Sequence, residues 1–136
     1  MRNNIPLFDV NASIGAGAKG YAEFRDARAL LAHMDRLGIA RALVWHLEAR
    51  DLHPNTGNRR LAREIAAEPK AAGRLFPAFV VHPAAPFENG MMEELNAAFA
   101  SGQARAIRLF PGASRCFLKE FERVLAAVQR HRPLVL

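Results

Sequence analysis

The chain has 136 residues, of which 51% are hydrophobic and 24% are charged, and these proportions exclude a disordered chain and indicate one globular domain over residues 1–136. The net charge is +6, but the basic residues are scattered along the whole chain, which argues against a nucleic-acid-binding surface. A single cysteine, Cys116, excludes an internal disulfide and a cysteine-based zinc site. The sequence also lacks a secretory signal and the roughly 18 consecutive apolar residues of a membrane helix. We therefore expect a cytoplasmic protein that binds neither nucleic acid nor membranes.

Short apolar runs alternate along the chain with segments in which apolar residues recur every three or four positions, as in strands followed by amphipathic helices. The predicted strands cover residues 5–10, 40–47, 75–81, 104–110 and 133–136. The helices between them have apolar faces within residues 30–37, 61–66, 91–99 and 117–128. We expect these helices to end at Gly38, before Pro69 and at Gly102, and we expect residues 55–57 to form a turn that caps the second helix.

Helical crossovers of this length force the strands to pair in parallel, which leaves an open doubly wound sheet or a (β/α)8 barrel. The glycine-rich segment 15–20 lies beyond the end of the predicted first strand and lacks the dinucleotide-binding spacing. A barrel typically needs about 250 residues. We therefore expect an α/β fold that contains the first four and a half units of a parallel (β/α)8 barrel.

Polar side chains occur where the predicted strands end, and in parallel folds this edge carries the functional groups. Asp9, Asn11 and Ser13 alternate along and beyond the first strand, so extended backbone would turn all three toward one cavity. The alternative is that Asp9 and Asn11 bond only to the backbone of a turn. His46 and His82 each close a strand and are candidates for moving protons.

Two further charged residues complete the candidate site. Glu48 is expected to orient His46 or to act as a base, with an ion pair to Arg50 as the alternative. Arg108 interrupts an apolar strand, so it needs a polar cavity or a partner if it points inward. A substrate carboxylate would suit its guanidinium, and pairing with Asp9 or Glu48 is the alternative.

The segment at residues 9–15, DVNASIG, resembles the D-x-H-x-H-x-G opening of the amidohydrolase-related metal-dependent hydrolases. Residues 33–44, 55–66, 74–83 and 104–111 are similar, in the same order, to later passages of that family, and residues 133–136 to its fifth strand. The resemblance therefore covers almost the whole chain.

This resemblance implies a barrel enzyme, a hydrolase or decarboxylase that acts on a small carboxylate-bearing substrate, with His46, His82 and Glu48 as catalytic candidates. Arg108, Asn11 and Ser13 would then bind the substrate. The family holds a zinc-like ion through histidines at the positions of Asn11 and Ser13, which are poor ligands, so we assign no metal ligand in this sequence.

Two other interpretations remain open. The first is a catalytically silent barrel relative that binds a small ligand or a protein partner, and the second is an open-sheet domain complete at Leu136. For the leading interpretation we expect this segment alone to be inactive and prone to aggregate or to form homo-oligomers, because half a barrel leaves strand edges unpaired.

Overall fold

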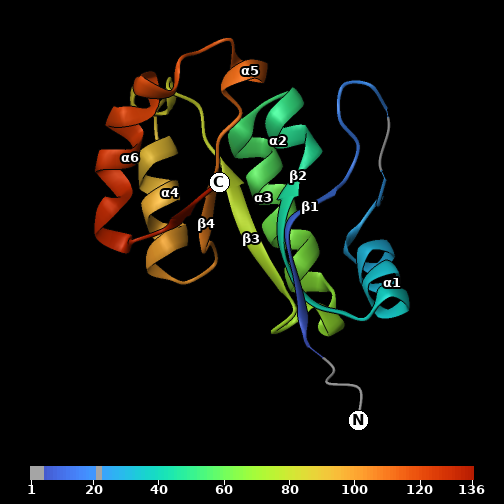
Figure 1. Cartoon of the computed structure of the whole chain (residues 1–136). Coiled ribbons are helices and arrows are strands. Elements are labelled where there is room, and N and C mark those ends of the chain that lie inside the picture. Colours follow the sequence, from blue (N-terminus) through green and yellow to red (C-terminus); the bar gives the residue numbers. More distant parts are fainter. Residues whose placement is uncertain (1–4, 21–22) are drawn as a thin grey trace.

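A computed structural model describes residues 5–20 and 23–136. Five parallel strands form one sheet in the sequential order β1-β2-β3-β4-β5. They are β1 (Leu7–Ile14), β2 (Ile39–His46), β3 (Leu75–Val80), β4 (Ala106–Arg108) and β5 (Leu134–Val135). The sheet curls into the shape of half a barrel (Figure 1).

Four crossover helices cover the outer face of this curled sheet. They are α1 (Ala27–Leu37), α3 (Pro54–Ala67), α4 (Met91–Ala100) and α6 (Glu122–Val128). Buried residues from all four helices belong to one hydrophobic cluster with alternate residues of the strands. A doubly wound sheet reverses its strand order and places helices on both faces. The sequential order and the single helix layer therefore exclude that alternative for this sheet.

The expected helix ends at Gly38, before Pro69 and at Gly102 are confirmed to within two residues, since α1, α3 and α4 end at Leu37, Ala67 and Ala100. Asp26 caps α1 by accepting a hydrogen bond from the Ala29 backbone N–H (2.8 Å), and Gly38 ends that helix with φ of 71°. Two other expectations differ from the structure. Residues 55–57 do not form a separate turn, because Pro54, with its fixed φ, already occupies the first helical position of α3. Phe117 lies outside the last helix and is 75% exposed.

Short helical segments lie in the connections. The structure adds α2 (Leu47–Asp51) and α5 (Pro111–Ser114), which the apolar periodicity did not predict because each is too short to show a period. Four 3₁₀ turns are η1 (Pro69–Ala71), η2 (Ala85–Phe87), η3 (Leu118–Phe121) and η4 (Gln129–His131). Among residues 5–20 and 23–136, no helix combines the length and apolarity that crossing a bilayer demands.

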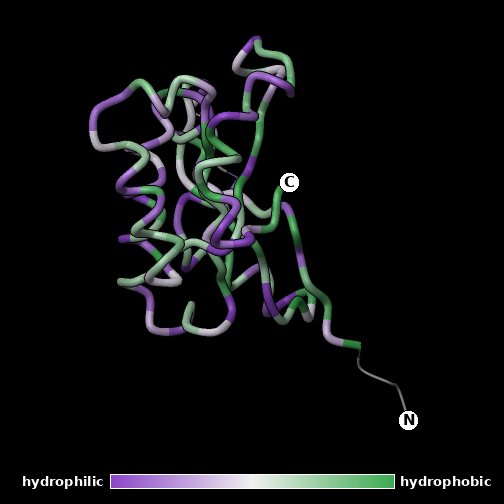
Figure 2. The backbone as a smooth tube through the Cα atoms, turned by 90° about the vertical axis from the view of Figure 1, so that its left-hand side faces the viewer, coloured by the Kyte–Doolittle hydropathy of each residue, from purple (hydrophilic) through white to green (hydrophobic). Residues whose placement is uncertain are grey.

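The sheet has apolar side chains on both faces. The convex face, defined here as the face that packs under the helices, includes Ile14, Val44, Phe79 and Ile107. The concave face, defined here as the opposite face, is a smaller cluster around Leu43, Trp45, Ala78, Val80 and Ala106. Hydrophobic and hydrophilic residues alternate along the helices, as one-sided burial requires (Figure 2). A side chain at the carboxyl end of a strand therefore lies either on the convex face, under the helices, or on the concave face.

Candidate functional site

Arg108 lies on the concave face at the carboxyl end of β4. It pairs in register with Val80, a member of the concave cluster, whereas its neighbour Ile107 packs under the helices. The Arg108 Nε is buried and has no hydrogen-bond partner among the described residues. Its guanidinium carbon lies 5.3 Å from the centroid of the Phe110 ring. The expected inward orientation of Arg108 thus places a cation against an aromatic surface.

Neither of the two carboxylates considered as partners neutralises Arg108. Glu48 accepts a hydrogen bond from Arg60 Nη1 (2.7 Å), and Asp9 Oδ1 accepts one from the backbone N–H of Asn11 (2.8 Å). Within the described part of the chain, no carboxylate oxygen lies within 4.0 Å of the Arg108 guanidinium. Arg108 is therefore a partly buried cation without a carboxylate partner in the described part of the chain.

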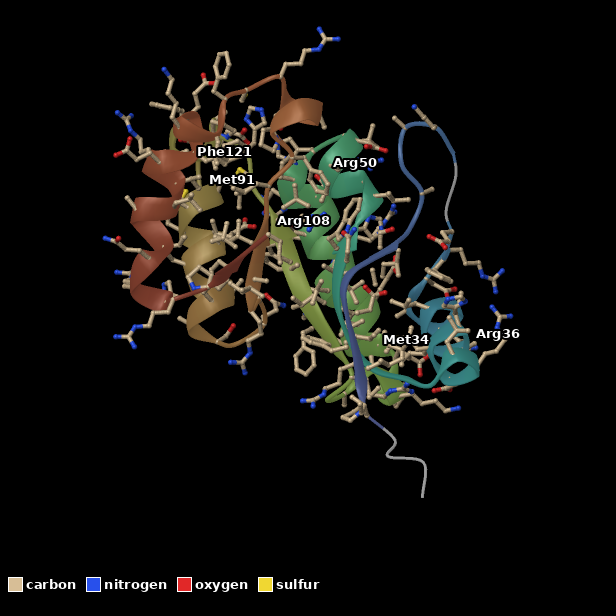
Figure 3. All side chains as sticks on the ribbon, viewed as in Figure 1. Met34, Arg36, Arg50, Met91, Arg108 and Phe121 are labelled. Carbon is tan, nitrogen blue, oxygen red and sulfur yellow. The ribbon has the colours of Figure 1, made fainter. Side chains whose placement is uncertain are left out.

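Arg50 brings a second guanidinium to the same aromatic surface. Its central carbon lies 5.2 Å from the Trp45 ring and 5.8 Å from the Phe110 ring, and these two rings are 4.7 Å apart. Figure 3 shows Arg50 and Arg108 near the carboxyl end of the sheet. Unlike Arg108, Arg50 is neutralised, because it forms an ion pair with Asp51. The hydrogen bond from Arg50 holds the pKa of Asp51 below its usual value.

The polar residues of β1 divide between the two faces. Asn11 Oδ1 accepts a hydrogen bond from the Trp45 indole N–H (3.3 Å), and Ser13 pairs in register with Trp45, so both belong to the concave face. Asp9 pairs instead with Ala42, a residue of the convex core, because the register shifts between Asp9 and Ala12. The prediction that Asp9 shares a cavity with the other two is therefore wrong, and its backbone hydrogen bond matches the turn-forming alternative.

His82 follows β3 at the same edge as Arg108 and is partly exposed. Its Nδ1 accepts a hydrogen bond from the backbone N–H of Ala84 (3.1 Å). An imidazole that accepts at Nδ1 carries its proton on Nε2 when it is neutral. His82 therefore presents Nε2 as its proton-bearing atom.

His46 ends β2 on the opposite face. It continues the alternation of Ala42 and Val44 on the convex side and is only 1% exposed. Gly15 closes over it, since a Cβ built on this glycine would collide with the His46 ring, and the glycine φ of 83° disfavours a side chain in any case. His46 Nδ1 accepts a hydrogen bond from the backbone N–H of Glu48 (3.1 Å), and His46 thereby caps the N-terminus of α2.

A small polar cluster surrounds His46 beneath the helices. Its Nε2 lies 3.7 Å from Glu64 Oε1, and neither Nε2 nor the second Glu64 oxygen has a hydrogen-bond partner among the described residues. Burial lowers the pKa of His46, against the opposing effect of Glu48. Burial also raises the pKa of Glu64. Both shifts follow from removing a charged form from water.

The structure thus separates the residues that the sequence placed in one site. Asn11, Ser13 and Arg108 share the concave face, and His82 lies at the edge beside them. His46 and Glu48 lie toward the helix layer, where Glu48 is bound to Arg60 instead of the Arg50 considered from the sequence. Sequence reasoning considered Arg50 only as a partner of Glu48, because the short helix α2 carries no recognisable period.

The described residues do not fit a resident metal ion. No three His, Cys, Asp or Glu side chains of residues 5–20 and 23–136 come together as a metal site. On the concave face, the family positions for histidine hold the amide of Asn11 and the hydroxyl of Ser13, which bind zinc-like ions poorly. We therefore assign no step of the chemistry to a metal.

Comparison of the chain with models of protein families, with curated proteins and with solved structures finds no match. The functional interpretation consequently depends on the geometry of the concave face and on the sequence resemblance.

Proposed function

We propose that the concave face binds a small carboxylate-bearing molecule through Arg108. The observation that carries this proposal is the buried Nε of Arg108, which has no partner among the described residues although an aromatic ring lies beside it. A buried N–H group without a hydrogen-bond partner, such as Arg108 Nε, is costly, and a guanidinium matches a carboxylate with two parallel hydrogen bonds. A carboxylate ligand would therefore satisfy a group that the described chain leaves unsatisfied.

The resemblance to amidohydrolase-related enzymes extends the proposal from binding to catalysis. The chain is then the N-terminal part of a (β/α)8 barrel that hydrolyses or decarboxylates its substrate. The sequential sheet with all crossover helices on one face supports this assignment, because successive barrel units have this arrangement. The protein would belong to the soluble enzymes that act on small molecules.

His82 is the residue proposed to move the proton. Hydrolysis and decarboxylation both need an acid, which protonates the leaving group in the first case and the carbon that loses carbon dioxide in the second. The neutral ring of His82 carries its proton on Nε2 while Nδ1 accepts the Ala84 N–H. His82 would therefore first take a proton from solvent at Nδ1, which releases the Ala84 N–H, and the resulting imidazolium would give its Nε2 proton to the substrate. Arg108 would hold a carboxylate beside it, since β3 and β4 are adjacent and Val80 pairs with Arg108. Asn11 and Ser13 would line the pocket on the β1 side.

The second candidate function is binding of a small carboxylate without turnover. It is favoured by the placement of two of the three catalytic candidates, His46 and Glu48, away from the concave face. The two functions differ in what happens to a bound ligand. Formation of carbon dioxide or of a hydrolysis product during incubation supports the enzyme, whereas recovery of the ligand unchanged supports the binder.

The first prediction concerns Arg108. Replacing Arg108 with Met should weaken the binding of benzoate by about 10- to 100-fold, since a hydrogen bond to a charged group contributes about 1.5–3 kcal/mol. The free energy of unfolding should change by less than about 1 kcal/mol. Isothermal titration with benzoate and with the neutral benzamide, together with urea unfolding, measures both quantities.

Arg105→Met is the matched control, because Arg105 precedes β4 at the amino edge of the sheet and is exposed. It should leave benzoate binding unchanged. Equal benzoate affinity in the wild type and the Arg108→Met variant, or equal affinity of the wild type for benzoate and benzamide, would contradict the assignment of Arg108.

A further inference from the structure

A cavity lies within the helix layer, between α3 and α4 over β3. Its volume is about 470 Å³, which is within the range of about 300–1,000 Å³ found for small-molecule sites. Figure 1 shows α3 and α4 on either side of β3. The two helices are joined by an ion pair between Arg59 and Glu94. The cavity is a cleft between the two helices, with β3 as its floor.

The inner wall of this cleft is apolar. The wall is formed by Ala62, Phe79, Val81, Met91, Leu95 and Ala98. Water in such a cleft finds few hydrogen-bond partners, so an apolar occupant that displaces it is favoured. The nearest polar side chain at depth, Asn58, is already satisfied, because its amide bonds both to the backbone N–H of Val80 (2.9 Å) and to its C=O (2.8 Å). The interior thus suits a hydrocarbon body.

The mouth of the cleft carries two cations and one anion. Arg59 donates two hydrogen bonds to the carboxylate of Glu94. Arg63 lines the same mouth and is exposed, and within the described chain no carboxylate oxygen lies within 4.0 Å of it. The charge left over at the mouth is therefore positive and is located at Arg63.

We propose that this cleft binds an amphipathic carboxylate, a molecule with an unbranched hydrocarbon chain that enters the cleft and a carboxylate that meets Arg63. The hydrocarbon chain would contact the apolar wall of the cleft. The carboxylate would pair with Arg63, which has no carboxylate partner in the described chain. The site is separate from the concave face, because its wall residues Phe79 and Val81 belong to the convex core, whereas Arg108 points to the other side of the sheet.

The second prediction tests this cleft with decanoate, below its micelle-forming concentration, and with its neutral counterpart decan-1-ol, below its solubility limit. Isothermal titration should show saturable binding of decanoate and at least about fivefold weaker binding of decan-1-ol. Arg63→Glu should weaken decanoate binding by about tenfold or more, since it replaces attraction with repulsion. Ala98→Phe should abolish binding by filling the cleft, and circular dichroism verifies that this variant is folded.

Two control variants show whether decanoate occupies this cleft or binds at an arginine elsewhere on the molecule. Arg36→Met removes a distant exposed arginine of α1 (Figure 3), and Arg108→Met removes the cation of the concave face. Arg36→Met should bind decanoate as the wild type does. Arg108→Met removes the carboxylate site proposed for the concave face and should keep a saturable decanoate site that the further change Arg63→Glu weakens. Absence of decanoate binding, unchanged binding in Arg63→Glu, or complete loss of binding in Arg108→Met would overturn the proposal.

Discussion

His46 and His82 have the same local arrangement and opposite surroundings. Each accepts a backbone N–H at Nδ1 from the residue two positions later, with the same distance of 3.1 Å. The sequence predicted that both close a strand; the structure confirms this for His46, the last residue of β2, whereas His82 lies two residues beyond the end of β3. It did not predict their faces, because strands alternate from residue to residue and an error of one residue in the strand end exchanges the two faces. His46 is buried because it falls on the convex face, under the helices.

The third prediction concerns the pH dependence of stability. Burial lowers the pKa of His46 in the folded chain, so the unfolded chain takes up the proton first as the pH falls below the ordinary histidine value of about 6.5. His46 therefore reduces stability as the pH falls through that region. Glu64 acts in the opposite direction: its pKa is raised, so its contribution is present at low pH and is lost as the pH rises through the folded value.

Two substitutions distinguish these contributions. His46→Asn keeps an acceptor for the Glu48 N–H and removes the titration, so its unfolding free energy should fall less steeply than that of the wild type between about pH 7 and pH 5. Glu64→Gln should fall more steeply, because it loses the opposing contribution. Urea unfolding over this pH range measures both slopes. Parallel curves for the wild type and His46→Asn would show that His46 does not titrate differently on unfolding.

Among the elements, α3 is hydrogen-bonded to the backbone of β3 through the side chain of Asn58. Asn58 is buried and forms two hydrogen bonds to Val80, one to its N–H and one to its C=O. The preceding Gly57 lets α2 approach, since a Cβ there would collide with the backbone of Ala49. Helical periodicity identified Leu61 and the later apolar residues of α3, but it gives no reason to expect an asparagine in the core.

The fourth prediction is that Asn58→Ala destabilises the chain by about 3 kcal/mol, because both backbone groups of Val80 lose their partner in a buried position. Asn96→Ala is the control in α4: its amide bonds to a carbonyl of its own helix, to the exposed side chain of Arg130 and to the partly exposed ring of His131, so it should cost less than about 1 kcal/mol. Urea unfolding measures both variants. A loss below about 1 kcal/mol for Asn58→Ala would contradict this account.

The length of β1 shows where predicting the elements from the sequence fails. The apolar run predicted a strand that ends at Val10, but β1 continues to Ile14. The alternation of polar and apolar residues continues because Asn11 has the Trp45 indole as its partner while Ala12 and Ile14 enter the convex core. Pairing between distant side chains therefore decides this boundary, and a single sequence does not reveal that pairing.

For the molecule as a whole, both outer strands of the sheet carry exposed apolar side chains. Phe8 and Val10 on β1 and Leu134 and Val135 on β5 are each 46–52% exposed, and in the described chain neither strand has a neighbour on its outer side. Unpaired strand edges with apolar side chains are templates for association. The separation of these edges at opposite ends of a curled sheet gives each molecule two such surfaces.

The fifth prediction is that residues 1–136 associate with one another in a concentration-dependent manner. The double variant Val10→Lys, Leu134→Lys should shift sedimentation-velocity profiles toward the monomer, since lysine on an edge strand opposes pairing. Leu52→Lys changes a residue that is 65% exposed but lies outside the strands, and it should leave association unchanged. A wild-type protein that sediments as a monomer at every concentration would contradict the prediction.

The sequential order of the strands has a consequence for the way the chain is made. Each strand pairs only with the strand before it and the strand after it along the sequence, so no strand has to wait for a distant segment to leave the ribosome. Pairing between close neighbours also keeps the loops that must be closed short, which favours fast folding. The longest paired register joins β1 to β2, and it can form while β5 is still being synthesised. The sheet can therefore grow in the direction of translation, one βα unit at a time.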